Sequence, residues 1–551
     1  MEKLHAVLLD AASIQSYVFG SNKLKENIGA SFIVEEIYRS ILTKAIKEAL
    51  SPSISLSNEL LEKWKELPHE FRLIKKPDEK VEIGYIGGGN ALIFFTDKSE
   101  AINFVKKWTQ DLLIDAPGLS TCVAFGEFEV NEDKNDFKNF AEDKKSLFEK
   151  LVINKNAYHR ETVIPRHGIT AICKRSGLSM ECEYGDEENK LEYISSVANG
   201  KLAKVPDANK RLQDAFEELL KDKFLFPFKL DDLGQKIGDS HIAIVHIDGN
   251  NIGKKFAECQ KIEELRKLSC YIKNRVKKSM EHIIKKLVKL AGDDENRAFE
   301  EIFELKTDKK SGKKFLPIRP IVYGGDDVTF VCDGRLGVFL AEKFMKVFHW
   351  DKSSESSFEL SSCSGISIIK TKYPFYRGYQ LAESLCKKAK REAKEDLSNE
   401  GINASWLDFH IAYGGFSGSL EMIRDKHYKI VRNNKNASLL LRPYRISPHN
   451  IWQREERNFD PIKNGMKHFM STWPTSKVHE LLRFLSLDDE TEETFIKGMR
   501  NRGHKLPDSK NSLWEHKDNR EVYTQYFDMI ELMEFYPEIL LQCSLTNVET
   551  L

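Results

Sequence analysis

The sequence of 551 residues is poor in cysteine, carries no net charge and contains no long apolar run. Its nine cysteines are scattered and odd in number, which favours reduced thiols in a cytosol over a disulfide framework. No apolar run approaches the roughly 18–20 residues that a membrane helix needs, and the first residues show no signal-peptide pattern. These absences predict a cytoplasmic protein without a membrane partner.

The charge balance excludes a strongly basic protein. Lysine and arginine together number 85, and so do aspartate and glutamate. A whole-chain field that attracts nucleic acid is therefore absent, although local basic patches remain open. At roughly 100–200 residues per domain, the length predicts three or four domains.

The most informative stretch is a Gly-Gly-Asp-Asp turn between the apolar runs 318–323 and 328–331. Two apolar runs around a glycine turn predict a β-hairpin with carboxylates at its tip. A strand-like run upstream, 241–247, ends in a further aspartate. Phosphoryl transfer depends on charge neutralisation and positioning, and Mg²⁺ prefers carboxylate oxygens. We interpret three residues as catalytic ligands of two Mg²⁺ or Mn²⁺ ions: Asp248, Asp326 and Asp327.

Several neighbouring residues could contact a nucleoside triphosphate. Glycine allows a tight bend and a close approach of the nucleotide, and backbone N–H groups before a helix can hold phosphates. Two lysines lie four positions apart on one face of the helix expected over 378–395 and could hold a triphosphate. The alternative is an ordinary turn with exposed acids and solvated lysines. The predicted contacts are Gly249, Asn250, Asn251, Gly324, Gly325, Lys390 and Lys394.

The order strand, helix, strand, strand, helix, strand occurs twice in the chain. This order is typical of a ferredoxin-like or palm domain. The first copy has a hairpin with Gly87-Gly88-Gly89-Asn90 at its tip, and no acids there. The predicted fold is α+β, with two palm domains, a helical or mixed linker domain and a C-terminal helical domain. The expected boundaries are 1–135 for the first palm, 136–235 for the linker domain, 236–445 for the second palm and 446–551 for the helical domain.

The motifs together resemble the large polymerase/cyclase subunit of type III CRISPR effector complexes, whose palm domains are related to the GGDEF nucleotide cyclases. The first copy carries Leu9-Asp10, Ser13-Ile14-Gln15-Ser16-Tyr17-Val18-Phe19, Lys23-Leu24 and Gly29-Ala30-Ser31. The second carries His246-Ile247-Asp248-Gly249-Asn250, Pro317-Ile318-Arg319-Pro320, Ser364-Gly365-Ile366 and Lys372-Tyr373-Pro374.

The resemblance implies synthesis of a cyclic or linear oligonucleotide messenger, usually from ATP, in antiviral defence. It assigns the metal ligands to the three aspartates above and the phosphate-binding lysine to Lys390, with Lys394 less surely. The first palm would hold a second nucleotide, with Ser31 and Gly88 as candidates. A 3′-hydroxyl of one nucleotide would attack the α-phosphate of the other and release pyrophosphate.

The sequence departs from this family in three respects. It has no adjacent His-Asp pair, so we expect no metal-dependent DNase activity. Cys173 and Cys182 lack a second cysteine pair, and with His167 nearby they favour structural thiols over a four-ligand zinc site. The chain is also short for the family, which is consistent with a stand-alone relative.

Two alternatives to a messenger-making enzyme remain open. One is a scaffold subunit that binds nucleotide structurally and docks CRISPR effector subunits and guide or target RNA through its C-terminal helical domain, whose partner could equally be a second copy of the chain. The other is templated polymerisation, although the sequence shows no basic groove for a long duplex.

Overall fold

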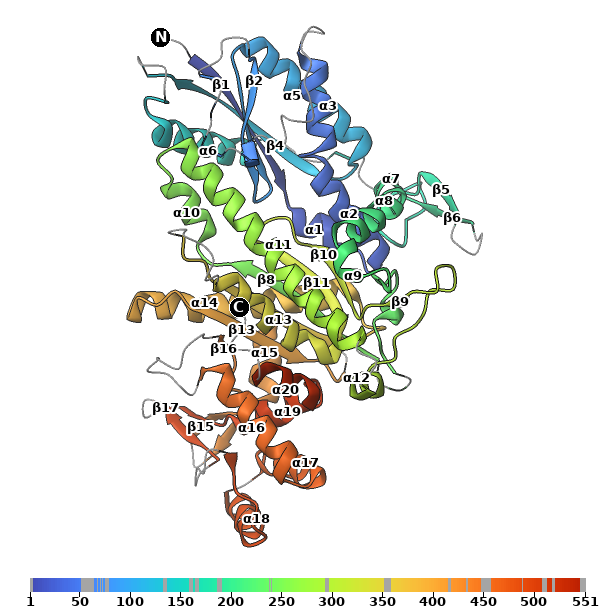
Figure 1. Cartoon of the computed structure of the whole chain (residues 1–551), viewed down its shortest axis with the longest axis vertical. Helices are drawn as coiled ribbons and strands as arrows, with labels where there is room; N and C mark the ends of the chain where they lie inside the picture. The colour runs from blue at the N-terminus through green and yellow to red at the C-terminus, as the bar shows by residue number, and fades with distance from the viewer. Residues whose placement is uncertain are drawn as a thin grey trace. The chain divides into compact units, whose positions relative to one another are not determined.

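The structure is a computed structural model that divides into two compact units (Figure 1). The first comprises 1–217, 251–277 and 321–328, and the second comprises 218–250, 278–320 and 329–551. The structure describes residues 3–50, 64–66, 68–69, 71, 73–74, 79–131, 136–157, 162–163, 168–185, 191–236, 238, 240–292, 297–350, 358–414, 418–432, 435–446, 457–487, 489–507, 513–517 and 521–545.

A four-stranded antiparallel sheet forms the centre of the first unit. Its order is β2-β3-β1-β4, and β1 pairs along its length with β4, from Lys3 opposite Glu129 to Ala12 opposite Ser120. Apolar side chains of β1 and β3 are buried, which accounts for their central positions. The strands are β1 (Lys3–Ala12), β2 (Val81–Gly87), β3 (Asn90–Phe95) and β4 (Ser120–Glu129).

The helix expected after β1 is divided into two. α2 ends at Glu36 and α3 begins at Ser40. At the break, Arg39 has a non-helical backbone with φ of −120° and ψ of −89°, and the Trp108 indole N–H donates to the Ile37 carbonyl over 3.0 Å. The helices of this part are α1 (Ile14–Phe19), α2 (Leu24–Glu36), α3 (Ser40–Ala49), α5 (Lys98–Asp115) and α6 (Phe140–Ala157).

A small mixed segment follows α6, as the sequence predicts. Cys173, Ile194, Ala198 and Leu202 form its buried core. The acidic loop expected from Tyr184 begins inside strand β5, and 186–190 lie outside the described residues. The elements are β5 (Cys182–Gly185), β6 (Leu191–Ile194), α7 (Ser196–Ala203), α8 (Val205–Ala215), α9 (Glu217–Leu220), β7 (Phe224–Leu225) and the 3₁₀ turn η1 (Leu230–Asp232).

The larger sheet has six strands in the order β10-β11-β8-β12-β13-β16. Its first four strands repeat the order of the smaller sheet, so the predicted internal duplication is confirmed at the level of strand order. β12 pairs antiparallel with β8 and parallel with β13. The strands are β8 (His241–Gly249), β10 (Ile318–Val322), β11 (Val328–Asp333), β12 (Ser362–Lys370), β13 (Ser405–Ile411) and β16 (Tyr444–Ile446).

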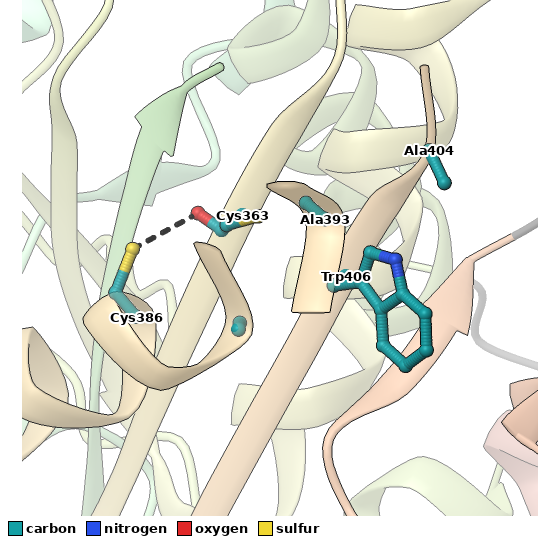
Figure 2. Packing of buried hydrophobic residues seen from close by; sticks show 6 residues of the cluster. Cys363, Cys386, Ala393, Ala404 and Trp406 are labelled. Atoms are coloured by element: carbon teal, nitrogen blue, oxygen red, sulfur yellow. Dashed lines mark hydrogen bonds between the residues drawn. The ribbon is translucent and has the colours of Figure 1, made fainter. Parts of the chain in front are cut away.

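Helix α14 packs on this sheet through small side chains (Figure 2). The Cys386 thiol donates to the Cys363 carbonyl over 3.3 Å, and Ala389 and Ala393 pack in the same cluster as Trp406. Gly365 of β12 allows the contact, because a Cβ there would lie 1.9 Å from the Ala382 carbonyl oxygen. The helices near the sheet are α10 (Ile252–Glu258), α11 (Ile262–Gly292), α12 (Arg297–Ile302), α13 (Gly337–His349) and α14 (Phe375–Glu400), with the short pieces β9 (Lys314–Phe315) and η2 (Gly334–Leu336).

The C-terminal part contains helices, as expected, together with a four-stranded sheet that the sequence did not reveal. The sheet has the order β14-β15-β18-β17. Its strands are only three or four residues long, too short for a periodic pattern to stand out. The elements are α15 (Leu420–His427), β14 (Lys429–Arg432), β15 (Lys435–Ser438), α16 (Phe459–Thr472), α17 (Thr475–Phe484), α18 (Asp489–Asn501), β17 (Glu515–Lys517), β18 (Glu521–Tyr523), α19 (Tyr526–Met533) and α20 (Glu538–Leu545).

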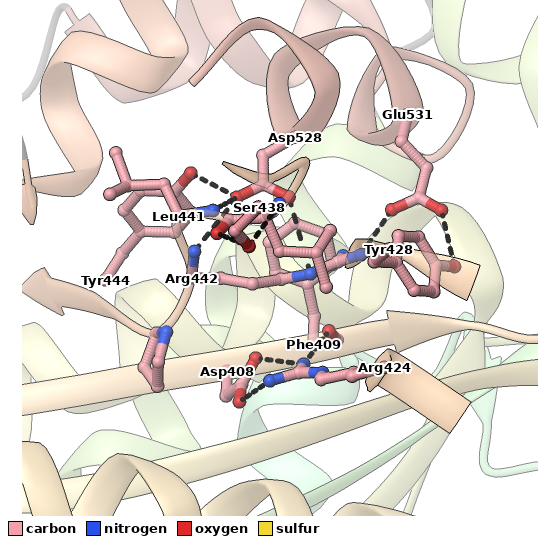
Figure 3. Close-up of polar contacts among 12 residues, drawn as sticks. Asp408, Phe409, Arg424, Tyr428, Ser438, Leu441, Arg442, Tyr444, Asp528 and Glu531 are labelled. Carbon is pink, nitrogen blue, oxygen red and sulfur yellow. Dashed lines mark hydrogen bonds and ion pairs between the residues drawn. The ribbon is translucent and has the colours of Figure 1, made fainter. Parts of the chain in front are cut away.

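A buried polar network joins α19 to β16 of the larger sheet and to the residues just before β16 (Figure 3). One carboxylate oxygen of Asp528 accepts from the backbone N–H groups of Leu441 and Arg442 and from the Tyr444 hydroxyl. The Arg442 guanidinium pairs with Glu531 over 2.6 Å. Each of these groups is buried and has a hydrogen-bond partner. The network therefore holds α19 against β16. Among the described helices, none is long and apolar enough to cross a membrane.

Candidate nucleotide and metal site

Strand β8 carries Asp248 to its carboxyl end, where the chain leaves the sheet. The strand is buried along its apolar residues, and the Asp248 side chain is half-buried. The next residues are fixed by hydrogen bonds, because the Asn250 side chain donates to the Ser361 hydroxyl over 2.9 Å and to the Ala404 carbonyl over 3.2 Å. Asn251 has a left-handed backbone, with φ of 56°, and is the residue immediately before α10. The predicted phosphate loop is therefore an ordered turn between a strand and a helix.

Lys390 of α14 extends to the end of β8. Its ammonium donates to the Asp248 carboxylate and, over 3.3 Å, to the Gly249 carbonyl. Burial lowers the pKa of Lys390, but the charge of Asp248 and the hydrogen bond to it outweigh burial and raise the pKa above its ordinary value. Lys390 is therefore a cation held beside the acid, and its predicted role in holding phosphate stays a prediction.

Lys394 lies one helical turn beyond Lys390, and its side chain is exposed. The structure shows no ion pair between it and Asp248. Its predicted role in holding phosphate stays a prediction.

The Gly-Gly-Asp-Asp turn connects β10 to β11, and β11 is the neighbour of β8 in the sheet. The His246 ring lies 3.1 Å from the Thr329 hydroxyl across these two strands. Ligand atoms of His246, Asp248 and Asp327 all lie within 4.8 Å of one another. The sheet thus brings together two of the three predicted metal ligands and one residue that the sequence did not assign.

Asp326 is not a member of that group of three. The two carboxylates follow each other in the bend between β10 and β11, and of the two Asp327 belongs to the group. The assignment of Asp326 as a metal ligand stays a prediction.

The donor atoms of this group suit a divalent cation. Carboxylate oxygens are the ligands that Mg²⁺ prefers, and imidazole nitrogen also suits transition metals. Burial lowers the pKa of His246 to about 4, so its ring is neutral near pH 7 and retains a lone pair. We expect the carboxylates of Asp248 and Asp327 to hold the ion, with His246 beside them.

Residues of the first unit contact the same turn. The Gln15 side chain donates to Asp327 over 3.2 Å, and the Ser31 hydroxyl donates to the Ile321 carbonyl. A Cβ on Gly325 would lie 3.8 Å from the backbone nitrogen of Gly88. Ser31 and Gly88, predicted as contacts of a second nucleotide, therefore both lie near residues 321–328.

The smaller sheet contains a second aspartate–lysine pair that the sequence did not reveal. Asp10 lies near the end of β1, as Asp248 does in β8, and Lys155 of α6 approaches its carboxylate to 2.7 Å. Ser13, which follows β1, has φ of 56°, the same value as Asn251. The two copies therefore share more than strand order. Aligning the ends of the two first strands, and the helices α6 and α14 that follow the fourth strand of each copy, would have indicated the pair.

An α+β sheet whose central strand ends in an aspartate, beside a hairpin with Gly-Gly-Asp-Asp at its turn, defines a palm domain. Residues 241–398 match the family model described as Cas10/Cmr2, second palm domain. The resemblance predicted from the sequence is confirmed for this segment, which contains Asp248, Asp326, Asp327 and Lys390.

Comparison with curated proteins finds no match. Among solved structures, a Csm1-Csm4 cassette in complex with cA4 is similar with a TM-score of 0.48 at 12% identity, covering 97% of this chain and 70% of that chain. Csm1 of T.onnurineus is similar with a TM-score of 0.48 at 14% identity, covering 98% of this chain and 70% of that chain. The apo Csm1-Csm4 cassette is similar with a TM-score of 0.43 at 12% identity, covering 97% of this chain and 70% of that chain. The family assignment rests on the palm segment.

Proposed function

We propose that this chain is a metal-dependent nucleotidyltransferase that joins nucleotides, with ATP as the preferred substrate, into a cyclic or linear messenger. The observation that carries the proposal is the group formed by Asp248, Asp327 and Lys390 in a segment that matches a Cas10/Cmr2 palm domain. A carboxylate pair beside a lysine suits a triphosphate and its counter-ions. We further propose that the smaller sheet is a first palm domain.

Each residue has a separate task in this proposal. Two divalent ions, when bound, would neutralise the phosphates and activate the attacking 3′-hydroxyl. Asp248, Asp326 and Asp327 hold the ions, and Lys390 donates to the phosphate oxygens instead of to Asp248. The backbone of 249–251 holds the terminal phosphates. Gly324 and Gly325 leave room for the nucleotide.

The first test measures product formation from labelled ATP with Mg²⁺ or Mn²⁺, followed by mass spectrometry of the product. We expect an oligoadenylate and the release of pyrophosphate. The double change Asp326→Ala and Asp327→Ala should lower the rate by about 10²-fold or more, since charge stabilisation by such groups is of that size. Asp425→Ala, which removes an acid from an exposed helical pair with Lys429, is the matched control. Full activity of the double variant would overturn the proposal.

The partners of the chain are part of the proposal. We propose that it works with CRISPR effector subunits, and that the segment after residue 446 docks them. Affinity purification of the tagged chain from its own cells, with and without ribonuclease, tests this. Recovery of small effector subunits together with guide RNA supports it, and recovery of the chain alone contradicts it.

A further inference from the structure

The first unit contains a cavity of about 290 Å³ that the proposed reaction does not use. Helix α1 and the residue before it line one wall, through Ser13, Ser16, Tyr17 and Gly20. The segment that follows α6 lines another wall, through residues that include Arg175 and Lys201. A volume near 300 Å³ is at the lower limit for small-molecule sites, so the cavity can take a ligand no larger than a mononucleotide.

The cavity lies on a different face of α1 from the Gly-Gly-Asp-Asp turn, residues 324–327. Its lining residues recur at positions 13, 16, 17 and 20, which share one side of a helix. Gln15 instead donates to Asp327, and Ile14 packs so close to Gly89 that a Cβ there would meet its Cδ1 at 2.7 Å. A ligand in the cavity is therefore separated from the turn by the helix itself.

Lys201 supplies a buried positive charge to this cavity. The residue is 7% exposed, its ammonium donates to the Tyr17 carbonyl over 2.6 Å, and it lies 4.1 Å from the centre of the Tyr17 ring. Among the described residues, no carboxylate lies within ion-pair distance of it. Burial lowers the pKa of Lys201 to about 8 and outweighs the Glu26 carboxylate, which raises that pKa. A buried ammonium without an ion pair is costly, and an anion in the cavity would offset that cost.

The other charged groups of the wall compensate one another. Arg175 pairs with buried Glu26 over 2.9 Å and with half-exposed Glu192 over 2.7 Å. Glu192 does not line the cavity. The charged residues that do are two cations, Lys201 and Arg175, and one carboxylate, Glu26. The serine hydroxyls of α1 add hydrogen-bond donors that suit phosphate oxygens.

We propose that this cavity binds a small phosphate-bearing ligand, with Lys201 as its principal cation. The site is additional to the proposed nucleotidyl-transfer site. The ligand would be either a free phosphate or pyrophosphate, or a mononucleotide whose phosphate enters the cavity.

Calorimetric titration of the full chain in EDTA tests the proposal, with inorganic phosphate, pyrophosphate and AMP as three separate probes. We expect saturable binding of at least one probe, and the probe that binds most tightly identifies the source of the phosphate. Lys201→Met should weaken that binding by about tenfold or more, since a hydrogen bond to a charged group contributes that much. Lys210→Met removes an exposed lysine of α8 and is the matched control.

A second variant keeps the test valid if Lys201→Met does not fold. Ser16 is exposed on the cavity wall, so Ser16→Glu should fold normally and weaken binding through charge repulsion. Ser486→Glu introduces the same charge at an exposed position in the C-terminal part and should bind as the wild type does. The proposal is overturned if no probe binds, if Ser16→Glu binds normally, or if Lys390→Met abolishes binding, because the phosphate would then occupy the turn.

Discussion

Lys390 connects the fold to the proposed chemistry at the level of a single side chain. Its ammonium pairs with Asp248 in the structure, and in the proposed function the same ammonium would hold phosphate once a divalent ion takes the carboxylate. A charge with two alternative partners explains why a lysine is tolerated at a half-buried position beside the end of β8.

Lys390→Met should lower product formation from ATP by about tenfold or more, mainly through a higher KM, because a charge-assisted contact to the triphosphate is lost. Steady-state kinetics at several ATP concentrations check this. Lys387→Met, on the same helix but paired with Glu383 at the surface, should leave the kinetics unchanged. Unchanged kinetics in Lys390→Met would remove this lysine from the site.

His410 of β13 should make stability depend on pH. Burial, and then the nearby charges of Arg442 and Arg424, lower the pKa of His410 to about 2. The unfolded chain binds a proton near pH 6.5 and the folded chain does not, so stability is lost as the pH falls below that value. Between about pH 6.5 and pH 5 the loss from this group alone is roughly 2 kcal/mol.

Urea unfolding at a series of pH values measures this dependence. His410→Gln should flatten the acid side of the stability curve, and His479→Gln, at an exposed position of α17, should not. An equal slope in wild type and His410→Gln would show that other groups cause the loss.

Close packing of α14 on β12 positions Lys390 at the level of secondary-structure elements. Gly365→Ala would place a Cβ against backbone atoms of α14, so we expect a loss of about 1–3 kcal/mol from overpacking. A lower ATP turnover should accompany it as Lys390 moves. Chemical denaturation and the ATP assay measure both effects. Gly498→Ala, in α18 with no atom within 4 Å of the added methyl group, should keep full activity, and Gly365→Ala with wild-type stability would contradict this account.

The contact between α19 and the segment before β16 depends on Asp528. Asp528→Ala would leave the Tyr444 hydroxyl and two backbone N–H groups buried without an acceptor, and we expect a loss of about 3–5 kcal/mol. Thermal and urea unfolding measure it. Asp425→Ala, at the surface, should change stability by less than about 0.5 kcal/mol. A loss that small for Asp528→Ala would show that the network does not hold the helix.

The sequence predicted the elements that are long enough to show a hydrophobic period, and the motifs whose residues are close together in the chain. The Gly-Gly hairpins, the duplicated strand order and the position of Lys390 on a helix all follow from periodicity and motif spacing. It missed the break between α2 and α3, where the apolar periodicity continues although the backbone of Arg39 leaves the helix. It missed β17 and β18 because they are short, and it missed Gln15 and Lys155 because their partners depend on the register of the sheet.

At the scale of the whole molecule, neither compact unit is one continuous piece of chain. The first unit needs 251–277 and 321–328 in addition to its N-terminal part. Arg266, from the first of these segments, is fully buried and pairs with Glu82 over 2.9 Å. The ammonium of Lys144 donates to carbonyl oxygens of 256, 257 and 259. Removing 251–277 would take away the cation that pairs with Glu82 and these acceptors of Lys144.

A chain that ends at residue 217 should therefore fail to form a stable fold, although it contains the whole four-stranded sheet. Circular dichroism with thermal melting and size-exclusion chromatography check this, with the full chain as the control. A cooperative melt and a monodisperse peak for the shortened chain would show that the N-terminal residues suffice.

The division of the chain also bears on its biosynthesis. The ribosome releases the N-terminal sheet early, but the stretch 321–328 that completes its unit appears only after β8 and the long helix α11 have been made. The residues that the later chain supplies to Glu82 and Lys144 lie in 251–277, so they are made before the stretch 321–328. The first unit is complete only when 321–328 has been made, and in the proposed function this same stretch carries Asp326 and Asp327.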